Sequence, residues 1–167
     1  MLIRPERSQD IAAIRDLTEA AFLTAAHRSG TEAAIVEALR RAGQLSLSLV
    51  AVSGDEIAGH VAFSPVSIGG QDKGWFGLGP VSVAPDRQRQ GIGSALIREG
   101  LRRLQARDAA GCVVLGDPAF YTRLGFAPTP ALHLPGVPPE YFMALAFDGV
   151  VPEGQVAYAP AFEDAGR

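Results

Sequence analysis

The segment "QRQGIGS", residues 88–94, opens a stretch with helical periodicity near the middle of the chain. Each glycine inside a helix is about 1 kcal/mol less favourable than alanine, so two of them at a helix start indicate that a bare backbone is needed there. The N–H groups of a first helical turn have no partner within the helix and lie at the positive end of its dipole. We expect the N–H groups of residues 90–94 to bind an anion, with Arg87 and Arg89 adding positive charge beside it. A ligand that carries phosphate fits this chemistry.

Two other phosphate-binding motifs do not fit this segment. A dinucleotide fingerprint needs Gly or Ala where Leu96 stands, and a P-loop needs a Gly-Lys-Ser/Thr that does not follow Gly91. The structural alternative is a helix that simply begins after a turn, with its glycines required for packing. The free donors and the neighbouring arginines favour a phosphate-bearing ligand over that alternative.

The elements that must position this segment follow from hydrophobic periodicity and turn residues. Helices are expected at 8–26 (with Ser8 as N-cap), at 31–43, from 91 onward, and briefly at 118–126. Strands are expected at 2–5, in a hairpin at 45–66, at 75–85, at 111–117, around 141–147 and near 154–159. A turn is expected at 69–74. This order predicts an α/β sandwich around one mixed sheet. The length of 167 residues fits one domain spanning 1–167.

Composition narrows the class of protein. Apolar residues make up 47% and charged residues 20%, which is typical of a globular chain, and the net charge of −3 argues against nucleic acid as a partner. Cys112 is the only cysteine, so no intrachain disulfide can form and a reducing compartment is expected. The first residues lack the apolar core of a signal peptide, and the apolar run at 45–52 is too short to span a bilayer. We expect a cytoplasmic protein that does not associate with a membrane.

Two motifs in a fixed order resemble the GNAT superfamily of acetyl-CoA-dependent N-acyltransferases. The strand "GPVSVAP" (79–85) leads into Gln88-x-x-Gly91-x-Gly93 at a helix start, and after one helix and one strand comes "FYTRLGF" (120–126). Either motif alone is weak, but both in this order are a specific signal, and the match covers about residues 49–126. With "GHVAFSPV" and "LGDPAFY", the chain looks like a branch of predicted bacterial N-acetyltransferases. The resemblance implies a three-layer sandwich: a mixed, mostly antiparallel central sheet flanked by helices.

The resemblance also implies the donor and how it is held. Acetyl-CoA would be the acyl donor, with its pyrophosphate on backbone N–H groups and its pantetheine arm paired like an extra strand with Val81 and Val83. Carried over residue by residue, the pyrophosphate-binding N–H groups belong to Arg89, Gln90, Gly91, Gly93 and Ser94. No metal is expected, because the three histidines and one cysteine show no metal-ligand spacing.

The implied reaction is direct attack of a primary amine on the thioester. Tyr121 matches the tyrosine that protonates the departing sulfur in this family; the alternative is an aromatic side chain that packs a short helix beside Phe120. Deprotonating the amine is the larger difficulty, because with a pKa of about 10.4 only on the order of one amine in a thousand is neutral near pH 7.

A general base is harder to find in the sequence. The strand at 75–85 holds no acidic residue, and Asp117 stands before Pro118, where we expect it to cap the short helix. His60, on a strand expected to place Ile57 and Val61 on its apolar face, is a candidate base or proton relay, although a lone strand histidine is more often structural. Water relayed to solvent is the alternative.

The acceptor is expected to lie between the loops at 23–31 and 127–141. The second loop is apolar and proline-rich with only Glu140 acidic, which disfavours a polycationic acceptor. The expected partner is an amine-bearing small molecule or protein, and a homodimer is left open. The competing function is a non-catalytic sensor or interaction module that binds acetyl-CoA or CoA without turnover.

Overall fold

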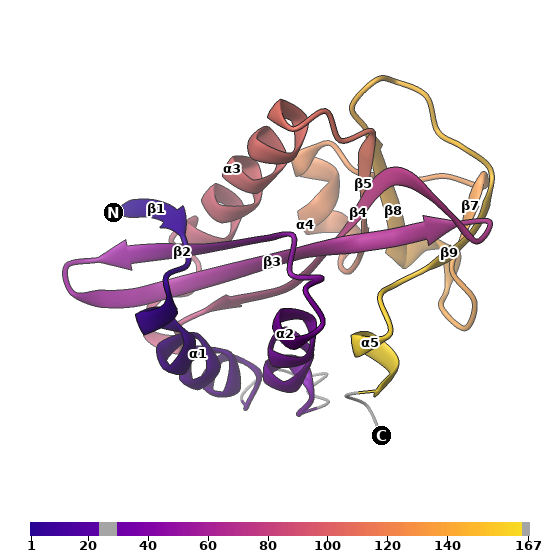
Figure 1. Ribbon diagram of the computed structural model, residues 1–167. Helices are drawn as coiled ribbons and strands as arrows, with labels where there is room; N and C mark the ends of the chain where they lie inside the picture. Colours follow the sequence, from indigo (N-terminus) through magenta and orange to yellow (C-terminus); the bar gives the residue numbers. More distant parts are fainter. Residues whose placement is uncertain (24–29, 165–167) are drawn as a thin grey trace.

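The computed structural model describes residues 1–23 and 30–164 (Figure 1). The strands are β1 (Leu2–Pro5), β2 (Leu47–Ser53), β3 (Glu56–Ile68), β4 (Gln71–Val83), β5 (Gly111–Leu115), β6 (Ala127–Pro128), β7 (Leu132–His133), β8 (Phe142–Ala146) and β9 (Gly154–Ala157). The helices are α1 (Ile11–Leu23), α2 (Glu32–Arg41), α3 (Ile92–Ala106), α4 (Pro118–Tyr121) and α5 (Ala161–Asp164). Short 3-10 turns lie at Ser8–Asp10, Pro85–Arg87, Thr122–Leu124 and Pro139–Tyr141.

The strands form one mixed sheet in the order β1-β2-β3-β4-β5-β8-β6. Neighbours along this order are antiparallel, except that β4 and β5 pair in parallel. Strand β9 joins the end of β3 through Ser67 and Ile68. The prediction of a mixed, mostly antiparallel sheet is confirmed.

Helices cover both faces of the sheet, with α3 on one face and α1 and α2 on the other (Figure 1). On the α3 face, Leu96 and Ile97 are fully buried in one cluster with Val61 and Phe63 of β3. On the other face, a separate cluster joins residues of α1, α2 and β2, namely Ile14, Val36 and Val50. Burying each such side chain is worth about 1.5–3 kcal/mol, so these two clusters hold the three layers together.

Strands β4 and β5 separate where the sheet would otherwise continue. They pair only over Trp75–Gly77 and Gly111–Val113, whereas on its other side β5 pairs with β8 over its full length. Between Phe63↔Leu78 and Val61↔Val81, β4 carries an extra residue relative to β3, an irregularity that bends a strand. Within the described residues, the edge of β4 that faces β5 therefore has no strand partner beyond Gly77.

Three details of the expected elements are wrong. Ser8 does not cap the first helix: the Arg7 N–H donates to the Asp10 carboxylate at 2.7 Å, and a 3-10 turn precedes α1. The predicted turn at 69–74 is confined to Gly69 and Gly70, because β4 already begins at Gln71. The small elements β6, β7 and α5 were not predicted, because two-residue strands and a single helical turn leave no periodic pattern.

A register shift explains a fourth difference. Ala51 pairs with Gly59 while Val52 pairs with Ile57, so one extra residue stands in β3 at Ala58. The shift moves Ile57 to the face that packs against α1 and α2, whereas Val61 remains on the α3 face. Ile57 and Val61 therefore do not share one apolar face as expected.

The expected helical residues 24–26 and the central part of the 23–31 loop lie outside the described residues. None of the helices in the described part of the chain is long and apolar enough to cross a membrane.

Candidate functional site: the α3 N-terminus and two adjoining pockets

Helix α3 begins without a side-chain cap. Gly91 occupies the N-cap position in a left-handed conformation with φ 83°, and it has no side chain to cap the first turn. The Ala95 N–H donates to the Gly91 carbonyl at 3.0 Å, so the N–H groups of residues 91–94 precede the first intrahelical bond. The backbone is thus the donor-rich helix start that the sequence predicts, and its conformation at residue 91 favours glycine.

Side chains on the approach to this helix fix it to the sheet. The Gln88 amide donates to the Val83 carbonyl at the end of β4 over 3.2 Å. Arg87 forms an ion pair with Glu56 of β3 at 3.4 Å, which reduces the positive charge it offers a ligand. Arg89 has a positive φ of 66° and is exposed beside the helix start.

A pocket of about 360 Å³ adjoins this N-terminus. Its lining residues are Ala21, Phe22, Val81, Val83, Gln88, Arg89, Gly91, Ile92, Gly93, Ser94 and Phe120. It therefore brings together six of the seven residues predicted to contact the donor, and the exposed Gln90 is the one outside its lining. A Cβ on Gly93 would lie 3.7 Å from Val83 and 4.0 Å from Val81, so a side chain there would enter the space between α3 and β4.

A second pocket, of about 670 Å³, begins where the first one ends, because both are lined by Phe22 and Val81. Its other lining residues are Glu32, Ile35, Leu78, Gly79, Pro80, Leu115, Tyr121, Leu134, Tyr158 and Phe162. It includes Leu78–Val81 of β4 and Leu115 of β5, and so lies where the two strands separate. Leu134 brings in the late loop that was expected to shape the acceptor site.

Tyr121 points into this second pocket from the end of α4. Its ring packs edge-on against Phe120 at 4.9 Å and Phe126 at 5.9 Å between centroids. A Cβ on Gly116 would clash with the tyrosine ring at 2.4 Å from Cε2, so only glycine there leaves room for the ring. Burial raises the pKa of Tyr121 to about 12, so its hydroxyl is protonated and able to donate at neutral pH.

Two polar residues of the second pocket were missed by sequence reasoning. Tyr158 follows β9, and its ring packs over Gly77, where a Cβ would lie 2.4 Å from Cε1. Burial raises the pKa of Tyr158 as well. Glu32, in the first turn of α2, supplies a carboxylate to the pocket, whereas residues 75–83 of β4 hold none. Both come from elements distant in sequence from the glycine motif, and no local pattern marks either.

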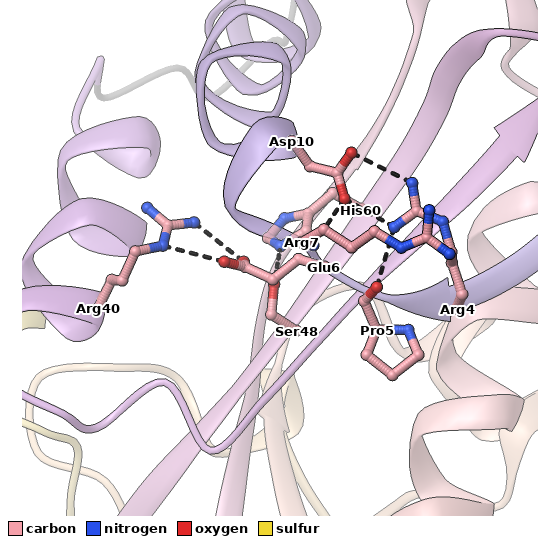
Figure 2. Close-up of polar contacts among 8 residues, drawn as sticks. All are labelled: Arg4, Pro5, Glu6, Arg7, Asp10, Arg40, Ser48 and His60. Atoms are coloured by element: carbon pink, nitrogen blue, oxygen red, sulfur yellow. Dashed lines mark hydrogen bonds and ion pairs between the residues drawn. The ribbon is translucent and has the colours of Figure 1, made fainter.

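His60 pairs with Val50 of β2 on the face of the sheet that α1 and α2 cover, and it lies in a buried chain of polar side chains (Figure 2). Its Nε2 is 2.8 Å from the Ser48 hydroxyl, and that hydroxyl donates a short hydrogen bond to the Glu6 carboxylate. Arg40 of α2 completes the chain with an ion pair to Glu6 at 3.0 Å. Because the Ser48 proton goes to Glu6, His60 must be the donor to Ser48, so the neutral ring carries its proton on Nε2.

The surroundings of His60 do not suit a base for the pocket that holds Tyr121. Its side chain is 0% exposed and lines neither of the two pockets. Burial lowers its pKa to about 4, and the Glu6 carboxylate only partly opposes that effect. The Nδ1 atom is buried without a hydrogen-bond partner. That His60 acts as the general base or proton relay stays a prediction, and none of the described contacts links His60 to the pocket.

Asp117 is confirmed as a helix cap, since its carboxylate accepts the Ala119 N–H at 3.0 Å. Cys112 is buried in β5, and burial raises the pKa of its thiol. Among the described residues, no cluster of three or more His, Cys, Asp or Glu side chains could hold a metal ion.

The fold agrees with what comparison with known proteins finds. The family model of the GNAT acetyltransferase domain matches residues 2–129. The chain therefore belongs to the GNAT acetyltransferase family.

Its relatives include an Escherichia coli K12 protein described as the uncharacterized N-acetyltransferase YhbS. YhbS is 41% identical over 127 residues, which cover 75% of this chain and 73% of YhbS. A crystal structure of E. coli YhbS in complex with CoA, 35% identical, superposes with a TM-score of 0.87 over 97% of this chain and 91% of that one. A GNAT acetyltransferase from Brucella melitensis in complex with acetyl-CoA is 52% identical, with a TM-score of 0.87 over 96% of this chain and 97% of that one. These matches confirm the predicted three-layer fold.

Proposed function

We propose that this chain transfers an acetyl group from acetyl-CoA to a primary amine. The observation that carries the proposal is the continuity of the site: the uncapped N-terminus of α3 adjoins one pocket, and that pocket shares Phe22 and Val81 with the pocket that holds Tyr121. The similar structures from Brucella melitensis and E. coli, which bind acetyl-CoA and CoA, support the choice of donor.

The backbone would hold the donor at two places. N–H groups at the start of α3 would bind the pyrophosphate; they belong to Arg89, Gln90, Gly91, Gly93 and Ser94. Each charge-assisted hydrogen bond is worth about 1.5–3 kcal/mol, which exceeds the loss of helix stability from two glycines. The unpaired edge of β4 at Val81 and Val83 would bind the pantetheine arm as an added strand would.

Acetyl-CoA supplies the acetyl group as a thioester, whose carbonyl carbon the amine nitrogen attacks while the carbon–sulfur bond breaks. Tyr121 donates its proton to the departing sulfur, for which its protonated hydroxyl in the pocket is suited, and it takes a proton back from solvent before the next turnover. Residues 75–83 of β4 hold no carboxylate that could remove the amine proton, and His60 lines neither of the two pockets. We propose that water in the open pocket carries that proton to solvent.

The test joins binding and turnover in one preparation. Calorimetry with CoA should show about one site per chain, and incubation with acetyl-CoA and a panel of primary amines should release free thiol only when an amine is present. Absence of CoA binding at high micromolar ligand would overturn the proposal. Binding without amine-dependent thiol release would leave the alternative function, a CoA-binding sensor or interaction module, which the lack of an acid at residues 75–85 favours.

A further inference from the structure

Glu32 is the only carboxylate that lines the described part of the second pocket. Most of its other lining residues are apolar, among them Ile35, Leu115, Leu134 and Phe162. Two tyrosines, Tyr121 and Tyr158, supply the remaining polar side chains. A single carboxylate in an apolar pocket is an arrangement that orients one cationic group and excludes further charge.

The position of Glu32 is fixed by the packing of α2. Glu32 lies in the first turn of that helix and is half-buried. Three residues on, Ile35 packs with Leu39 against Ala159 and Ala161. At the other end of α2, Arg40 is tied to Glu6 by hydrogen bonds of 3.0 and 3.1 Å (Figure 2). The helix is thus held at one end by the segment that leads into α5 and at the other by Glu6, and Glu32 is presented from a fixed element.

The carboxylate has the right chemistry for an ammonium group. An amine acceptor arrives mostly as a cation near neutral pH, and an ion pair with a partly desolvated carboxylate is stronger than one in water. Glu32 already interacts with another group of the chain, but a carboxylate accepts several hydrogen bonds at once. A second charge on the acceptor would meet either repulsion from Glu32 or the apolar lining, where an unpaired charge is unfavourable.

We propose that Glu32 selects the acceptor: it binds the ammonium group of a monoamine whose remaining body is apolar and packs against Ile35, Leu134 and Phe162. This inference rests on the proposed acetyl transfer and names the substrate class of that same site. Amino acids, which carry a carboxylate beside the amine, and polyamines are poor acceptors by the same reasoning.

Binding to the CoA-saturated protein tests the inference without turnover. The probes are 2-phenylethylamine and its uncharged analogue 2-phenylethanol, titrated by calorimetry into the wild-type chain, Glu32→Gln and Glu19→Gln. Glu19 is an exposed acid on α1 outside this pocket and serves as the matched control. Because one charge-assisted interaction is lost, Glu32→Gln should bind 2-phenylethylamine roughly 10-fold more weakly than the wild type. The alcohol should bind all three proteins alike, and Glu19→Gln should match the wild type for both probes.

Three results would overturn the inference: no binding of 2-phenylethylamine to the wild-type complex, equal amine affinity in wild type and Glu32→Gln, or an equal loss for the alcohol. CoA affinity and melting temperature of each variant show whether the fold is retained. If Glu32→Gln does not fold, the wild type alone decides, since it must prefer 2-phenylethylamine over both phenylalanine and spermidine.

The outcome is separable from that of the proposed function. Wild-type protein that acetylates amines while Glu32→Gln keeps the same KM for them refutes the role of Glu32 and leaves acetyl transfer standing. Amine binding that depends on Glu32, without thiol release from acetyl-CoA, refutes acetyl transfer and leaves the amine site standing.

Discussion

The proposed protonation of the departing sulfur depends on one group, the hydroxyl of Tyr121. It is protonated at neutral pH because burial raises its pKa to about 12, and it lies in the pocket where β4 and β5 separate. Replacing it with phenylalanine keeps the ring contacts to Phe120 and Phe126 and removes only the proton donor.

Tyr121→Phe should lower turnover on any accepted amine by roughly 10²-fold, the low end for general acid catalysis, because a thiolate also departs without help. CoA affinity should be unchanged, since the hydroxyl is not among the groups proposed to hold the pyrophosphate. Steady-state thiol release and calorimetry measure the two quantities. Tyr141→Phe, at an exposed position, is the control, and a Tyr121→Phe enzyme with the full rate would make Tyr121 a packing residue only.

The burial of His60 leads to a prediction about the free energy of unfolding and not about the rate of acetylation. Burial lowers its pKa to about 4 in the folded chain, whereas an unfolded histidine titrates near 6.5. Below pH 6.5 the unfolded state therefore binds a proton that the folded state does not. The free energy of unfolding should fall as the pH decreases from 6.5 toward 4.5, by up to about 1.4 kcal/mol per pH unit.

Urea unfolding of wild type and His60→Gln across that interval measures this slope, which should be shallower in the variant. The pKa of Glu6 is lowered from 4.5 because its hydrogen bonds to Arg40 and Ser48 outweigh its desolvation, and that of Asp10 is lowered from 3.8 chiefly by Arg4. These two carboxylates lose their stabilising effect only at lower pH, so they do not obscure the histidine. Equal slopes in the two proteins would show that His60 is not held neutral by burial.

The same variant tests His60 as a base. The structure separates His60 from both pockets, so we expect the pH dependence of amine acetylation to be the same in wild type and His60→Gln. An inflection in the wild-type profile that disappears in the variant would contradict this and assign the proton transfer to His60.

At the scale of elements, the start of α3 and the free edge of β4 make up the donor site together. Gly93 stands between them, with Val83 3.7 Å from the position a Cβ would take. Its backbone conformation is not left-handed, so a larger residue there tests the space and not the conformation.

Gly93→Val should lower the affinity for CoA at least 10-fold, because the valine side chain enters the pocket and displaces the pyrophosphate from the N–H donors. Each of those hydrogen bonds is worth about 1.5–3 kcal/mol. Stability should change by less than about 1 kcal/mol, because valine is not a worse helix former than glycine. Arg98→Val, at an exposed position of the same helix, is the matched control. If calorimetry gives both variants the wild-type affinity for CoA, the glycines of the motif serve packing and not ligand binding.

Elements of ordinary length could be predicted from the sequence, and the shortest could not. Alternation and helical periodicity marked β2, β3, β4, α2 and α3, and the motif order marked the family. The register shift at Ala58 leaves no trace in the local pattern, because it depends on pairing with Ala51 and Val52 of β2. The start of α1 was misplaced because Asp10, three residues into the turn, caps the chain instead of Ser8.

At the scale of the whole molecule, the sheet joins segments from both ends of the described chain. β1 lies at one edge, and β9 pairs with the end of β3. We infer that residues 1–167 form one N-acetyltransferase domain. The second pocket shows why part of the site was beyond sequence reasoning: α1, α2, β4, β5, α4 and the segment after β9 all line it. The motif residues Tyr121 and Val81 could be predicted, but Glu32 and Tyr158 reach the pocket only through the tertiary fold.

Acetyl transfer by the intact chain is tested most directly by a product balance. Purified protein is incubated with acetyl-CoA and a panel of primary amines, and free CoA and N-acetylated amine are quantified together by mass spectrometry. The account predicts that at least one amine is acetylated, with equal amounts of free CoA and acetylated product. Release of CoA without an acetylated amine, or binding of CoA with no product from any amine in the panel, would contradict it.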